Sequence, residues 1–70
     1  MEWNDIAAKW MQFKGSAKQE WGKLTDDDLD YIAGTRDRLI GRLQEKYGMT
    51  EAEAERQAER WFQTRKNPAA

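Results

Sequence analysis

The chain has 70 residues, with 12 basic and 13 acidic side chains and a formal charge of −1 at neutral pH. It contains neither cysteine nor histidine, which excludes disulfides and removes the usual ligands of zinc, haem and iron–sulfur centres. A chain of this length forms one domain whose core only just offsets the entropy of ordering, and its balanced charge creates no overall attraction to nucleic acid or anionic lipid.

The first predicted helix covers residues 3–21. Asn4 is predicted as its N-cap, Gly22 is expected to end it in the left-handed conformation, and Gly15 is the residue at which it could bend. Its apolar residues are spaced three and four apart, as on one face of a helix: Trp3, Ile6, Trp10, Phe13, Ala17 and Trp21. Because the chain has few other large apolar side chains, this stripe is interpreted as core rather than as a membrane-surface or partner-binding face.

Two later helix starts share one signature, a threonine cap followed three residues on by an acid. The pairs are Thr25 with Asp28 and Thr50 with Glu53. Between these starts the apolar residues would share one face even in a continuous helix, so periodicity leaves open whether the helix breaks at residues 33–35. Glycine followed by threonine is a turn signal, and a break is therefore predicted there.

The fourth predicted helix places Ala54, Ala58 and Trp61 on one side, and Gly48 is expected to end the helix before it. Residues 1–66 are expected to form a single helical domain, followed by a frayed tail at 67–70. Apolar and polar residues nowhere alternate with the period of two that is typical of strands. The predicted fold class is therefore all-α, a small bundle of about four short helices. The expected core consists of Trp3, Ile6, Trp10, Phe13, Trp21, Leu29, Ile32, Leu39, Leu43, Tyr47 and Trp61.

One part of the sequence has a specific order of residues, Trp21-Gly22-Lys23-Leu24-Thr25-Asp26, continued by Ile32-Ala33-Gly34, Leu39-Ile40-Gly41 and Tyr47-Gly48. With these residues the chain resembles the CsbD-like family of small bacterial stress-response proteins, over residues 3–61. The resemblance implies about four helices arranged as two crosswise-packed hairpins, abundance under stress, and no catalytic residues. The chain departs from the family pattern at Ala8, where a glycine is expected, and at Ala17, where a branched aliphatic residue is common.

A basic ridge is predicted on the third helix, where Arg38, Arg42 and Lys46 recur at four-residue steps. Such a ridge could contact phosphates. The alternative is that these cations pair with the acids of residues 26–30, with Glu45 or with glutamates of the fourth helix on a solvated surface. The acid block and the net charge oppose nucleic-acid binding, which is therefore kept as the second hypothesis for function.

Asp26, Asp28 and Asp30 have the spacing of the first three calcium ligands of an EF-hand loop. Tyr31 and Asp37 stand where that loop needs glycine and glutamate, so the acids are interpreted as complementing the positive end of a helix dipole. No metal site is predicted.

Arg36 projects into an apolar face. We expect its side chain to rest on a tryptophan while its guanidinium group reaches a carboxylate.

An enzyme is not predicted, because histidine and cysteine are absent and Ser16 is the only serine. A domain this small also has little volume for a deep pocket. No catalytic residue and no cofactor are assigned. We expect a non-enzymatic, cytoplasmic stress-response protein, a monomer or weak homo-oligomer without membrane insertion, that acts on an unidentified macromolecular partner or as an abundant soluble protectant.

Overall fold

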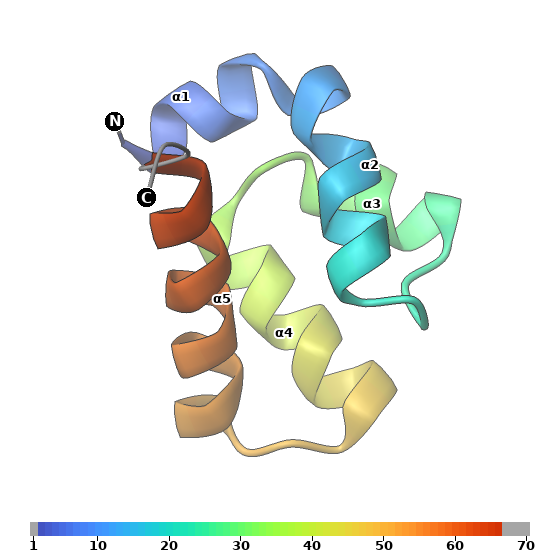
Figure 1. Cartoon of the computed structure of the whole chain (residues 1–70). Helices are drawn as coiled ribbons and strands as arrows, with labels where there is room; N and C mark the ends of the chain where they lie inside the picture. Colours follow the sequence, from blue (N-terminus) through green and yellow to red (C-terminus); the bar gives the residue numbers. More distant parts are fainter. Residues whose placement is uncertain (1, 67–70) are drawn as a thin grey trace.

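The computed structural model describes residues 2–66, and these residues form five helices and no strand (Figure 1). The all-α fold class is thereby confirmed, while the predicted tail at 67–70 lies outside the described residues. The helices are α1 (Trp3–Ala8), α2 (Trp10–Glu20), α3 (Asp26–Ile32), α4 (Arg36–Tyr47) and α5 (Glu51–Lys66).

The first predicted helix is in fact two helices, because the chain bends at Lys9 rather than at Gly15. Lys9 has φ −116° and ψ 30°, outside the helical region, and α2 starts at the next residue. The bend carries α1 across the end of α5 (Figure 1), where the Trp3 ring stacks on Phe62 with centroids 4.7 Å apart. Aromatic packing against α5 thus overrides the continuous helical periodicity of the sequence.

Two predicted helix ends are wrong for local reasons. Asn4 lies inside the first turn of α1, and the helix instead begins after Glu2, whose N–H donates to the Asp5 carboxylate at 2.8 Å. Gly22 is not left-handed, because α2 already ends at Glu20 and Trp21 leaves the helix with φ −127° and ψ 84°. Trp21 takes this conformation as its ring enters the core.

The two threonine caps are confirmed. The Thr25 hydroxyl accepts the Asp28 N–H at 3.1 Å, and the Asp28 carboxylate accepts the Thr25 N–H at 2.9 Å. The Thr50 hydroxyl likewise accepts the Glu53 N–H at 3.1 Å. Both interactions satisfy N–H groups that the first turn of a helix leaves without a partner.

The predicted break between α3 and α4 is confirmed at Ala33 and Gly34, whose φ angles are 47° and 77°. Gly34 is buried, and a Cβ there would lie 2.5 Å from the Ala7 Cα, so only glycine permits this turn to approach α1 so closely. Gly48 ends α4 with φ 64°, as expected.

Trp61 of α5 lies at the centre of the aromatic core. Its ring centroid is 5.8 to 6.4 Å from the centroids of four other rings, those of Trp3, Trp10, Phe13 and Trp21. These rings come from α1, α2 and the segment after α2, so Trp61 joins the amino-terminal part of the chain to α5.

The buried indole N–H groups find acceptors on other segments, as buried polar groups require. Trp10 donates to the Leu29 carbonyl at 2.9 Å, Trp21 to the Gln57 side chain at 2.9 Å, and Trp61 to the Ser16 hydroxyl at 3.2 Å. The bonds fix the orientation of each ring as well as its burial.

The residues expected in the core are placed as follows. Buried are Ile6, Trp10, Trp21, Leu29, Ile32, Leu39, Leu43 and Trp61, while Trp3, Phe13 and Tyr47 are partly buried and pack against them. The same core contains Ala17, Leu24, Ile40, Ala54, Ala58 and Phe62. In Figure 1, α4 and α5 form an antiparallel hairpin on one side, and α2 and α3 pack together on the other.

None of the helices described is long and apolar enough to cross a bilayer.

Candidate functional site

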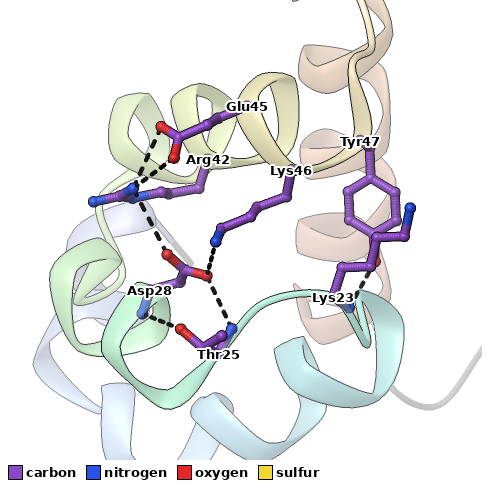
Figure 2. Close-up of polar contacts among 7 residues, drawn as sticks. All are labelled: Lys23, Thr25, Asp28, Arg42, Glu45, Lys46 and Tyr47. Carbon is purple, nitrogen blue, oxygen red and sulfur yellow. Dashed lines mark hydrogen bonds and ion pairs between the residues drawn. The ribbon is translucent and has the colours of Figure 1, made fainter.

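Charged side chains of α3 and α4 meet on one face of the molecule, with Asp28 at the centre (Figure 2). Asp28 is 5 % exposed, the most buried charged residue among those described. In addition to the bonds with Thr25, Oδ1 of Asp28 lies 3.7 Å from the Arg42 guanidinium, and Oδ2 lies 3.4 Å from the Lys46 ammonium. The N-terminal turn of α3 is thereby tied to the second half of α4.

This environment lowers the pKa of the Asp28 carboxyl below its ordinary value. The main cause is the hydrogen bond from the Thr25 N–H, and Lys46 adds to it, while burial acts in the opposite direction. The lowered pKa means that Asp28 is ionised at neutral pH, where its charge offsets the cations of α4.

Arg42 and Arg38 both contact Tyr31 of α3. The guanidinium carbons of Arg42 and Arg38 lie 4.3 Å and 5.0 Å from the centroid of the Tyr31 ring, which are cation–π distances. Arg38 also donates to the Tyr31 carbonyl at 3.0 Å, and Arg42 to the Glu45 carboxylate at 3.2 Å. The two arginines are thus held in place at one ring.

A groove of about 360 Å³ opens at this ring. Tyr31 is 47 % exposed, although it is one of the large aromatic residues. Nothing lies within 4 Å of the position that a Cβ of Gly41 would occupy, so the missing side chain leaves the groove open there. The residues that line it are Tyr31, Asp37, Arg38, Gly41, Arg42 and Glu45.

The residues of the predicted basic ridge lie on this face, but among carboxylates. Arg42 and Lys46 face Asp28, Arg42 also pairs with Glu45, and Arg38 contacts Tyr31. The pairing with acids that the sequence left as the alternative is present for Arg42 and Lys46. Nucleic-acid contact through Arg38, Arg42 and Lys46 stays a prediction, and the neighbouring acids weigh against it.

The three alternating acids of α3 each face a different cation. Asp30 is 2.6 Å from the Lys14 ammonium and Asp26 is 3.5 Å from that of Lys18, whereas Asp28 points toward α4. The hydrogen bond to Asp30 raises the pKa of Lys14. Asp26 and Asp30 therefore connect α3 to α2, and the acids diverge instead of converging on one point.

Tyr31 was not singled out by the sequence as a site residue. Its only local signal is that it lies off the apolar face of α3 defined by Leu29 and Ile32. Its importance arises from the turn at Ala33 and Gly34, which brings Arg38 and Arg42 of α4 beside the ring. A pattern within one helix contains no information about that juxtaposition.

Arg36 pairs with a carboxylate, as predicted. Its Nε donates to Glu59 of α5 at 2.8 Å, and this bond raises the pKa of the guanidinium. Among the described residues, a cation–π contact with a tryptophan is made by Arg65, whose guanidinium carbon lies 5.7 Å from the centroid of the Trp61 ring.

The amino-acid sequence is similar to those of bacterial proteins. The family model described as CsbD-like matches residues 4–56. A UPF0337 protein of Rhodopseudomonas palustris is 52% identical over 66 residues, which are 94% of this chain and 100% of the relative. A UPF0337 protein of Pectobacterium atrosepticum is 51% identical and the UPF0337 protein YjbJ of Escherichia coli strain K12 is 46% identical, each over 61 residues, 87% of this chain and 88% of the relative.

Proposed function

This chain belongs to the CsbD-like family of bacterial proteins, and we propose that it is a non-enzymatic stress-response protein that acts by contact with a protein partner. The contact surface is the groove lined by Tyr31, Arg38 and Arg42. One observation carries this proposal: an exposed tyrosine ring lies against two arginine guanidinium groups beside open space.

The composition of the groove favours a protein as the partner. Tyrosine and arginine are the residues enriched at the energetic centres of protein interfaces, because they offer large contact areas and several hydrogen bonds. The carboxylates of Asp37 and Glu45 line the same groove. A polyanion would be repelled by them, whereas a protein surface of mixed charge can match both signs.

The placement of the reactive side chains supports a non-enzymatic role. The Ser16 hydroxyl accepts hydrogen bonds from Trp61 and Arg65, and Asp28 is occupied by the helix cap and two cations. These groups connect helices to one another. Loss of a measured turnover on substitution of a single carboxylate or lysine would contradict this part of the proposal.

Crosslinking in stressed bacterial cells tests the contact surface. Tagged wild-type protein is compared with Tyr31→Ala and with the matched control Met11→Ala, which removes a side chain that is 85 % exposed on α2. We expect a partner that is crosslinked by the wild type and by the control and is lost with Tyr31→Ala. Equal crosslinking by all three, with circular dichroism showing intact folds, would contradict the groove as the contact surface.

The nucleic-acid hypothesis is tested separately with labelled DNA and RNA at low salt. Arg38→Glu reverses a charge whose described contacts are to Tyr31 alone, and Arg60→Glu makes the same change on an exposed position of α5. Selective loss of affinity with Arg38→Glu would favour nucleic acid over protein as the partner. We expect weak binding that the two substitutions reduce alike.

A further inference from the structure

The bend at Lys9 has no local cause in the sequence. Sharp helix bends occur at proline, at glycine or where the backbone ladder is interrupted by an inserted group, and residues 2–14 contain neither proline nor glycine. The Lys9 N–H still reaches the carbonyls of Asp5 and Ile6, at 3.1 and 3.2 Å. The conformation is therefore imposed by what α1 contacts.

The contacts that hold α1 lie on later parts of the chain. Trp3 stacks on Phe62 and lies 6.2 Å from the Trp61 ring centroid, while Ile6 is fully buried. The backbone of Ala7 lies directly against Gly34. Figure 1 shows α1 reaching from the top of α2 over to the end of α5.

An unbent alternative is encoded in the same residues. At about 100° per residue, the stripe from Trp3 through Trp10 to Ala17 stays on one face if α1 and α2 are one helix. Short helices are marginal because nucleation is unfavourable, and a helix continued from α1 into α2 avoids a second nucleation. Straightening withdraws Trp3 and Ile6 from their own molecule and exposes the complementary surface at Phe62 and Gly34.

We propose that α1 is an exchangeable arm that docks on a second copy of this chain, so that two chains form a reciprocal dimer. Each arm then makes on its partner the contacts that it makes within the monomer, at Phe62, Trp61 and Gly34. Exchange of an identical element between two chains is a low-cost route to a dimer, and a short hinge such as Lys9 favours it. The occupant is a second copy because that copy carries the same docking surface that α1 contacts within its own molecule.

The test is the dimer fraction after refolding from denaturant at millimolar and at micromolar protein concentration, measured by analytical ultracentrifugation. We expect dimer at the higher concentration. Lys9→Gly lowers the equilibrium constant for forming the continuous helix by about fourfold at each hinge. Because the dimer contains two such hinges, the dimerisation constant should fall by about 15-fold. Gln19→Gly is the matched control, since residue 19 is exposed and helical in both forms.

Each outcome decides the proposal. A dimer that Lys9→Gly weakens and Gln19→Gly does not supports arm exchange. A chain that stays monomeric at both concentrations, or a dimer that both glycine variants affect equally, overturns it.

Mixing two complementary variants gives a readout that surface association would not produce. Trp3→Leu alters the arm and Phe62→Leu alters its dock, and both keep an apolar side chain. In an exchanged heterodimer of the two, one arm–dock pair is unaltered and the other carries both changes. Because Trp3 and Phe62 stack on each other, the second change in that pair costs less than the first, so the heterodimer is favoured over the two homodimers. Native mass spectrometry after co-refolding is expected to show more heterodimer than a statistical mixture. A statistical ratio would contradict exchange.

Discussion

Asp28 has two structural roles, as the reciprocal cap of α3 and as the counter-charge of Arg42 and Lys46. Asp28→Asn keeps an oxygen that can accept the Thr25 N–H but removes the charge. We expect a loss of about 1–2 kcal/mol in the free energy of unfolding at pH 7, below the value for a fully buried pair because both cations are partly exposed. Urea denaturation measures it.

The effect of Asp28 on stability depends on pH with a definite sign. Folding lowers the pKa of Asp28 below its ordinary 3.8, so the unfolded chain binds the proton more tightly than the folded protein. The stabilisation is complete above about pH 5, decreases as the pH approaches the ordinary value of 3.8, and is lost as the pH falls through the lowered folded pKa. The difference between wild type and Asp28→Asn should therefore shrink on acidification, at constant ionic strength.

Asp27→Asn is the control, because Asp27 lies in the same first turn of α3 but is exposed. Its effect is expected to stay within about 0.5 kcal/mol. A difference between wild type and Asp28→Asn that stays constant down to pH 3 would contradict the assignment of the lowered pKa to this residue.

At the scale of the elements, the contact between α1 and the α3–α4 turn depends on Gly34. Gly34→Ala places a Cβ 2.5 Å from a backbone atom of Ala7 at a residue with φ 77°. We expect it to destabilise the protein by about 2–4 kcal/mol, the sum of the left-handed strain and of overpacking against a backbone that can only move as a whole. Hydrogen exchange should show reduced protection of α1.

Gly48→Ala separates these two causes. Gly48 has φ 64° but open space around the added Cβ, so only the conformational cost of about 1–2 kcal/mol is expected. If both variants lose equal stability, the close approach of α1 to Gly34 contributes nothing measurable.

The helix starts at Thr25 and Thr50 could be predicted from the sequence because a cap is a local interaction, complete within four residues. The bend at Lys9 could not, since its cause is the stacking of Trp3 on Phe62, almost a whole chain length away. The groove at Tyr31 was missed for the same reason. Its arginines were identified as residues of interest, but the ring that orders them belongs to another helix.

At the scale of the whole molecule, stability depends on a small number of aromatic rings. The chain has no valine and no cysteine, and Trp61 contacts rings from both α1 and α2 as well as Trp21. Removal of one ring from so small a core therefore destabilises several helices at once. We do not expect local unfolding of a single helix to compensate for this loss of stability.

Trp61→Ala is expected to cost about 3–5 kcal/mol, a large part of the total stability of a domain of this size. Trp10→Ala and Trp21→Ala are expected to cost similar amounts, because both rings are buried and hydrogen-bonded across segments. Met11→Ala on the exposed side of α2 should stay within about 0.5 kcal/mol. Thermal denaturation followed by circular dichroism measures all four, and a loss below about 1 kcal/mol for Trp61→Ala would mean that the core does not depend on this ring.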